Sequence, residues 1–161
     1  PLARMQPLAT CFIDCTLRAE KHVASGCIRA NGDDFAQRLR QIHEAILELI
    51  ARYRPDEVAV EKVFMHRNAD SALKLGQARG AAICAAVVGG AALYEYAPRA
   101  IKLAVVGTGA ADKAQVSTMV QAMLGISEPS TADVSDALAV ALCHGQVQRS
   151  ALRLVVAGAS R

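Results

Sequence analysis

The strongest constraint on the fold is a single apolar stripe in residues 35–53. Its members recur at alternating steps of four and three along the chain: Phe35, Leu39, Ile42, Ile46, Leu49 and Tyr53. This spacing puts them on one face of an amphipathic α-helix, and Pro55 ends that helix. The apolar face has to be buried, so the neighbouring segments are expected to supply a layer that packs against it.

Predicted strands and helices alternate along the rest of the chain. The strands are predicted at residues 8–14, 22–29, 57–63 and 93–96. The helices are predicted at residues 68–89, from residue 98 through Lys102, and at residues 112–124 and 131–146. This order is typical of an α/β fold with a mixed β-sheet flanked by helices. We expect one domain over residues 1–146, followed by a flexible tail over residues 147–161.

The bulk composition is typical of a globular intracellular domain. Of the 161 residues, 53% are hydrophobic and 20% are charged, which excludes a disordered chain. No apolar run is long enough to cross a membrane, and the N-terminus lacks the order of a signal peptide. The five cysteines have no zinc-ligand spacing, so we interpret them as free thiols of a cytoplasmic protein. The net charge of +3 permits a polyanionic partner without requiring one.

Three acidic residues are candidates for a metal site. Glu61 lies inside the predicted strand EVAVEKV, whose alternation puts Glu57, Ala59, Glu61 and Val63 on one face. An unpaired carboxylate in the middle of such a strand is costly to bury. Asp133 and Asp136 are three residues apart near the start of the last predicted helix, so both project from one face. Three converging carboxylates form an oxygen-rich site for hard cations such as Mg²⁺. Two such ions, about 4 Å apart, can activate a water and stabilise the leaving oxygen of a phosphodiester.

A purely structural interpretation of the same acids stays open. Asp133 follows Ser130 by three residues, which resembles a capping box, and any acid in a first turn is favoured by the helix dipole. Glu61 could form an ion pair with a buried arginine instead of binding a metal. The spacing of these residues does not by itself separate the two interpretations.

Three stretches of the chain resemble the RuvC family of Holliday-junction resolvases. They are VEKVFM and RNADSALKLGQARG at residues 60–65 and 67–80, VVGTGAADK at residues 105–113, and ADVSDALA at residues 132–139. The similarity runs without gaps from about Val23 to His144, which is most of the chain. It implies a ribonuclease-H-like fold and a metal-dependent endonuclease that resolves four-way junctions in DNA recombination and repair.

The resemblance also implies a metal centre. Glu61 matches the strand glutamate of the family, and Asp133 and Asp136 match its paired helix aspartates, which are three of four metal ligands. The implied cofactor is Mg²⁺, two ions per active site, with Mn²⁺ as a possible substitute.

A set of DNA contacts and partners follows from the same resemblance. Phe64 matches the aromatic residue that wedges against unstacked bases near the cut. Lys102 and Lys113 match basic residues that contact phosphate near the active site. The implied partners are four-way junction DNA, a second copy in a homodimer that nicks opposing strands symmetrically, and the branch-migration proteins RuvA and RuvB.

The N-terminal residues depart from the family pattern. RuvC proteins begin with a strand that carries an aspartate in a Gly-Ile-Asp-Pro-Gly context, which is the fourth metal ligand. Extending the gapless alignment backwards from Phe12 puts Leu2 at that position, and leucine cannot bind a metal. The first strand is therefore expected to be atypical or missing over residues 1–10. Either a frame shift has replaced the start of an otherwise intact protein, which we favour, or the protein has lost its first ligand.

Three functions are compatible with this sequence. The first is an active resolvase that makes paired nicks by two-metal hydrolysis. The second is a dimer that grips four-way junctions but cleaves weakly or not at all. The third is an unrelated α/β interaction domain whose acids form caps and ion pairs, and it predicts no affinity for branched DNA at moderate salt.

Overall fold

The computed structural model describes residues 8–16, 19–62, 69–127 and 131–158. The strands are β1 (Leu8–Cys15), β2 (Glu20–Ile28), β3 (Glu57–Glu61) and β4 (Ala92–Tyr96). The helices are α1 (Phe35–Tyr53), α2 (Ala69–Val88), α3 (Pro98–Val106), α4 (Lys113–Leu124) and α5 (Ala132–Gly158). Every element predicted from the sequence is present, with most boundaries within two residues. An α/β fold is confirmed.

Local caps explain where the helices begin and end. The Asp34 side chain accepts a hydrogen bond from the Ala36 amide and starts α1, while Arg54 ends it in the left-handed region at φ 48°. Asp112 and Gln115 form a reciprocal capping box at the start of α4. This cap fixes the first residue of α4, Lys113, close to the beginning of α5.

The described strands form two separate two-stranded sheets. β1 and β2 are antiparallel, with a register shift between Phe12 and Ile13. β3 and β4 are parallel, and Glu61 lies opposite Tyr96 at the end of that pair. The strand directions are mixed, as expected, but no described strand joins the two pairs into one sheet. The segment in which an atypical or missing first strand was expected, residues 1–7, lies outside the described residues.

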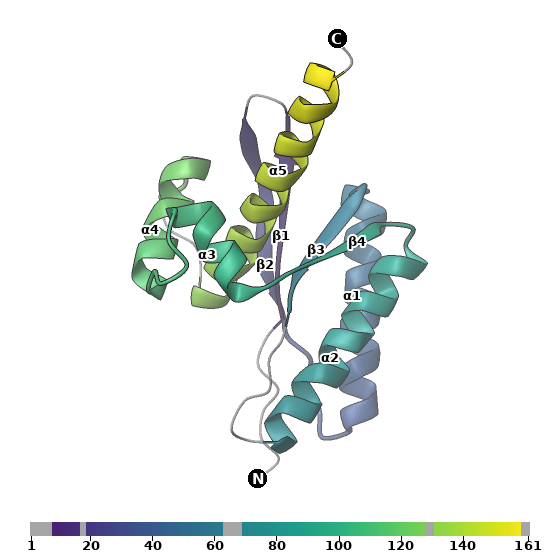
Figure 1. The fold of residues 1–161 in the computed structure, drawn as a ribbon. Coiled ribbons are helices and arrows are strands. Elements are labelled where there is room, and N and C mark those ends of the chain that lie inside the picture. The colour runs from purple at the N-terminus through teal and green to yellow at the C-terminus, as the bar shows by residue number, and fades with distance from the viewer. Residues whose placement is uncertain (1–7, 17–18, 63–68, 128–130, 159–161) are drawn as a thin grey trace.

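The strand layer lies between two groups of helices (Figure 1). Ala9, Cys11 and Ile13 of β1 pack toward the core on α5, while Phe12 faces the other way and stacks on Tyr53 of α1 with ring centroids 4.3 Å apart. The alternation of a strand thus brings one face of β1 to α5 and the other to α1. Figure 1 shows α1 and α2 together on one side and α3 and α4 on the other.

The main core is built by α3, α4 and α5. Its buried members are Ile101, Val105, Ala111, Val116, Val120, Val134, Leu138, Ala139, Val140, Leu142 and Cys143. Ala59 of β3 and Tyr96 of β4 pack against this cluster from the strand layer. The core therefore ties the end of β3 to the first half of α5, which are the two elements that carry the predicted metal ligands.

The predicted end of the last helix, near Gln146, is wrong because α5 continues to Gly158. The residues after 146 are mostly good helix formers without a proline, and the next glycine is Gly158 itself. Arg149 in this extension forms an ion pair with Glu20 of β2, and both side chains are largely buried. The first part of the expected tail is thus attached to the β1–β2 hairpin. None of the described helices is long and apolar enough to cross a membrane.

Candidate metal centre

Glu61 is held at the end of β3, on the face that looks toward α5. Strand alternation places Glu57, Ala59 and Glu61 on one face, as predicted, and Ala59 packs against the α5 core. Arg79 of α2 fixes the same strand end from behind, because its Nε donates to the Glu61 carbonyl oxygen at 3.3 Å. Arg79 also forms an ion pair with Glu95 of β4. The end of β3 that carries the Glu61 carboxylate is therefore held by α2, β4 and α5.

Asp133 and Asp136 lie in the first turns of α5. The Thr131 hydroxyl accepts from the Val134 amide at 3.2 Å, and the Thr131 carbonyl accepts from the Ser135 amide. Thr131 thus caps the start of α5, whereas Ser130, the expected partner of Asp133 in a capping box, lies outside the described residues. The positive end of the helix dipole favours carboxylates in this position. This effect does not separate a structural role of the two aspartates from metal binding.

The charges of the predicted site residues act on one another. The pKa of Glu61 is raised above its usual range, first by burial and then by the negative charge of Asp136. Lys113 and Lys102 act in the opposite direction on the same carboxyl. The negative charge of Asp136 on α5 thus acts on the Glu61 carboxyl of β3. Such a pair is favourable when a cation comes between them.

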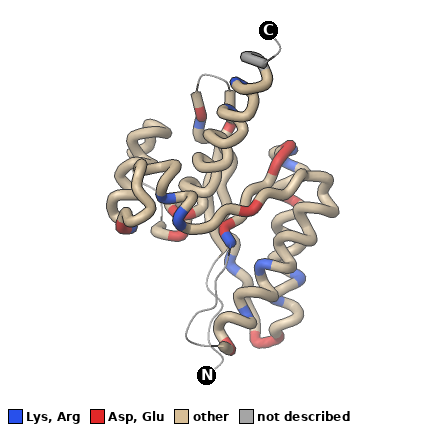
Figure 2. The backbone as a smooth tube through the Cα atoms, in the orientation of Figure 1, with Lys and Arg blue, Asp and Glu red and all other residues tan. Residues whose placement is uncertain are grey.

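Lys113 is the cation that faces these acids in the structure. Its Nζ donates to Asp136 Oδ2 at 3.0 Å. The pKa of Lys113 is raised, first by that hydrogen bond and the charge of Asp136, with smaller contributions from Asp133 and Glu61. Lys113 thus interacts with all three predicted ligands. Figure 2 shows acidic and basic positions close together where the end of β3 faces the beginning of α5.

The side chains do not form a closed metal cage as they stand. Within the described parts of the chain, no group of three His, Cys, Asp or Glu side chains is positioned to hold a metal ion. The donor set nevertheless fits a hard cation, because it offers carboxylate oxygens and neither thiol nor imidazole. The ammonium of Lys113 on Asp136 supplies positive charge where a cation would bind. We conclude that the residues fit a hard divalent ion but would have to close around it.

Two predicted positions lie outside the described residues. They are Phe64, the expected base-wedging residue, and Leu2, which stands where the fourth ligand was expected. Lys102 is described on α3, and its charge acts on Glu61. The role of Arg79 was missed from the sequence, although the residue lies in the quoted LGQARG run. A basic residue on an Ala-rich helix gave no indication that it would reach the end of a strand.

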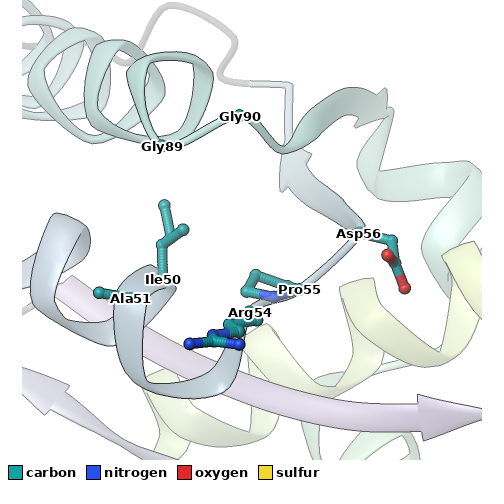
Figure 3. Close-up of a pocket in the computed structure, with 7 residues that line it drawn as sticks. All are labelled: Ile50, Ala51, Arg54, Pro55, Asp56, Gly89 and Gly90. Atoms are coloured by element: carbon teal, nitrogen blue, oxygen red, sulfur yellow. The ribbon is translucent and has the colours of Figure 1, made fainter.

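The hollow drawn in Figure 3 is not part of this site. It has a volume of about 460 Å³ and lies where α1 and α2 end and β3 begins. Its lining residues are Ile50, Ala51, Arg54, Pro55, Asp56, Gly89 and Gly90. The hollow is therefore at the opposite end of β3 from Glu61, and it contains none of the predicted ligands.

Comparison with known proteins agrees with the geometry. The family model described as "Crossover junction endodeoxyribonuclease RuvC" matches residues 10–144. A protein of that name from Methylococcus capsulatus is 62% identical over 122 residues, which are 76% of this chain and 74% of the relative. Another from Marinobacter nauticus is 54% identical over 141 residues, 88% of this chain and 81% of the relative.

A solved structure matches over almost its whole length. The structure of Thermus thermophilus RuvC in complex with Holliday junction substrate aligns with a TM-score of 0.79 at 31% identity. The alignment covers 89% of this chain and 96% of that one. The fold and the cluster of acids and lysines thus define a nuclease of the ribonuclease-H-like class. Within that class, this chain belongs to the RuvC family of crossover junction endodeoxyribonucleases, which are hydrolases that act in DNA recombination and repair.

Proposed function

We propose that this chain resolves four-way DNA junctions by hydrolysing phosphodiesters at a metal centre held by Glu61, Asp133 and Asp136. RuvC nucleases are metal-dependent. The observation that carries the assignment of residues is the hydrogen bond from Lys113 Nζ to Asp136 Oδ2 at 3.0 Å, which joins a predicted phosphate contact to a predicted ligand. The charge of Asp136 also helps to raise the pKa of Glu61 on β3, which supports the same grouping.

Each residue has a distinct task in this proposal. A bound divalent ion would supply an activated water and neutralise charge on the scissile phosphate. Glu61 is held in place by Arg79 and would bind the ion through its carboxylate. Asp133 and Asp136 would hold the ion from the first turns of α5. Lys113 would leave Asp136 and, with Lys102, contact the phosphate of the substrate, so that an anionic substrate meets a site of positive charge.

The identity and number of the ions belong to the proposal. Mg²⁺ is proposed because the donors are all carboxylates, and Mn²⁺ accepts the same ligands. Two ions per site are proposed for in-line displacement, which is the arrangement in which attacking and leaving oxygens are both stabilised. Two ions need more protein or substrate oxygens than three side chains provide, and Leu2 adds none.

The proposed substrate is four-way junction DNA, with Phe64 placed against unstacked bases at the cut. The structural relative solved with a Holliday junction supports this choice. A homodimer is proposed because symmetric nicking of a two-fold junction needs two sites, and RuvA and RuvB are proposed as partners through family membership. We place the protein in the cytoplasm, which its five free cysteines support. One nuclease domain is proposed, predicted over residues 1–146 and extended by the rest of α5, which continues to Gly158.

A second candidate function is junction binding with weak or no cleavage. Leu2 at the position of the fourth ligand favours it, and so does the lack of a closed three-ligand group among the described residues. In this case the lysines would still grip the phosphates, but the metal would bind poorly. Both candidate functions predict that the protein binds four-way junctions, but only the first predicts that it nicks them efficiently.

The decisive experiment measures nicking and binding of a synthetic four-way junction by the same variants. Glu61→Gln is expected to abolish Mg²⁺-dependent nicking and to leave junction binding without metal within about twofold, because one neutralised ligand does not remove a phosphate contact. Glu48→Gln on the exposed side of α1 is the matched control and should nick normally.

The possible results separate the candidates. Normal nicking by Glu61→Gln would show that the site is assigned wrongly. If the unmodified chain binds junctions without nicking them, the second candidate holds. Absence of any preference for branched DNA at moderate salt would contradict both functions.

A further inference from the structure

A buried histidine connects the two elements that carry the proposed metal ligands. His144 of α5 is only 8% exposed. Its Nε2 is 2.8 Å from Glu57 Oε2 on β3, and its Nδ1 is 2.8 Å from the Tyr96 hydroxyl on β4. Both ring nitrogens therefore have partners, and the partners belong to both strands of the parallel pair. A buried imidazole with two such bonds is held in one orientation.

Further contacts close the network around this histidine. Glu57 Oε1 accepts from the Tyr94 hydroxyl at 3.1 Å and from Gln148 Nε2 at 3.2 Å. The rings of Tyr94 and Tyr96 lie 4.6 Å and 5.7 Å from the imidazole centroid. Two residues of α5 and three residues of the β3–β4 pair thus form one connected hydrogen-bonded unit.

The direction of one of these bonds follows from its partner. Because Tyr94 and Gln148 both donate to Glu57, its carboxylate acts as an acceptor. His144 Nε2 therefore donates to Glu57, and His144 Nδ1 faces the Tyr96 hydroxyl. Every polar side-chain atom from Tyr96 through His144 to Glu57 thus has a hydrogen-bond partner.

The network and the proposed metal centre are two ends of one contact between a helix and a strand. Glu57 and Glu61 lie on the same face of β3, four residues or about 13 Å apart. His144 and Asp136 lie on α5, eight residues or about 12 Å apart. Because the two spacings match, the bonds at one end set how closely Asp136 approaches Glu61 at the other. Ala59 and Val140 pack in the core between the two ends.

We propose that His144 is a positioning residue for the metal centre: through Glu57 and Tyr96 it fixes α5 against β3 so that Asp136 and Glu61 can share one ion. This inference rests on the proposed function, because it takes these acids as the ligands. His144 itself would not touch metal or DNA. The sequence could not reveal the role, since Glu57 and His144 are 87 residues apart and fall in no common motif.

A histidine that merely stabilised the fold would behave differently. Its loss would lower the free energy of unfolding, but the folded fraction would bind metal as before. A positioning residue changes metal affinity in the folded protein, because ligands held about 1 Å too far apart bind weakly. The test therefore measures metal affinity and stability on the same variants.

The experiment compares four variants of the full chain with the unmodified protein. Binding of Mn²⁺ is measured by electron paramagnetic resonance of the free ion, at a temperature at which circular dichroism shows every variant folded. His144→Ala removes both bonds, whereas His144→Gln keeps a donor toward Glu57. Ile42→Ala, at a position on α1 that is 2% exposed, is the matched control for lost core stability. Glu61→Gln tests the ligand set itself.

We expect His144→Ala to weaken Mn²⁺ binding by about tenfold, the lower end of what supporting residues around metal sites contribute. His144→Gln should recover most of that loss, and Ile42→Ala should bind as the unmodified protein does. Unchanged Mn²⁺ affinity in His144→Ala, together with lost affinity in Glu61→Gln, would overturn the positioning role and leave the metal centre intact. Unchanged affinity in Glu61→Gln would refute the metal centre, and the positioning role with it.

Discussion

Replacement of Lys113 by alanine is expected to tighten binding of a divalent ion and to slow DNA cleavage. Lys113 donates to Asp136 Oδ2 at 3.0 Å, so its ammonium competes with the ion for a ligand. The same lysine is proposed to contact the substrate phosphate once it is released. Lys113→Ala is therefore expected to raise the affinity for the ion and to lower the rate of cleavage. Few other substitutions in the site would move the two properties in opposite directions.

The size of the effect on metal binding follows from the geometry. An ion about 2.1 Å from Asp136 Oδ2 would lie within about 5 Å of the Lys113 ammonium, and their repulsion in water is about 1.7 kcal/mol. The Lys113 side chain is 78% exposed and Asp136 is 44% exposed, so the lysine can swing away. In doing so it loses an exposed ion pair worth at most about 1 kcal/mol, which is less than the repulsion from the ion. Binding of the ion to the unmodified protein therefore includes this smaller cost. Lys113→Ala removes the cost, so its affinity for the ion should be two to five times higher.

The assay is a titration with Mn²⁺ at fixed ionic strength, followed by nicking of a four-way junction at saturating metal. Lys113→Arg is the control, since it keeps the charge near Asp136. We expect Lys113→Ala to bind Mn²⁺ two to five times more tightly, to cut more slowly and to unfold within about 1 kcal/mol of the unmodified protein. Weaker Mn²⁺ binding by Lys113→Ala would refute the competition between lysine and metal.

Two further predictions follow from the electrostatics and the buried pairs. Asp136→Asn should lower the pKa of Glu61, because the charge of Asp136 helps to raise it, and NMR titration of the carboxyl would detect this; an unchanged pKa would mean that the two carboxylates do not interact. Glu20→Ala should reduce the free energy of unfolding in urea by about 3 kcal/mol, since it leaves the largely buried Arg149 without its partner. A loss below about 1 kcal/mol would show that the pair is solvated.

Local signals were sufficient to predict most of the fold. The apolar stripe and Pro55 gave the limits of α1, because both act within a few residues of the helix that they define. Helix α4 begins at Lys113, one residue after its predicted start, and the Asp112 cap that fixes this start is equally local. The predicted end of α5 near Gln146 was wrong, because the residues that follow are good helix formers and none of them ends the helix before Gly158. The sequence also does not reveal that Arg149 pairs with Glu20, because this is a tertiary contact.

The sequence predicted which residues form the candidate site, but it did not predict the contacts that support them. Strand alternation indicated that Glu61 would share a face with Ala59, and the spacing of Asp133 and Asp136 indicated a common helix face. Family resemblance joined these acids into one site. The contacts of Arg79 and His144 could not be predicted, because their partners lie on other elements and no sequence pattern encodes the distance between them.

Glu61 and the two aspartates of α5 are proposed to close around a divalent ion. Anomalous scattering from crystals grown with Mn²⁺ would locate such an ion without any assay of activity. We expect a peak within about 2.3 Å of carboxylate oxygens of both Glu61 and Asp136. A Mn²⁺ peak bound elsewhere, with Lys113 still paired to Asp136, would refute this arrangement.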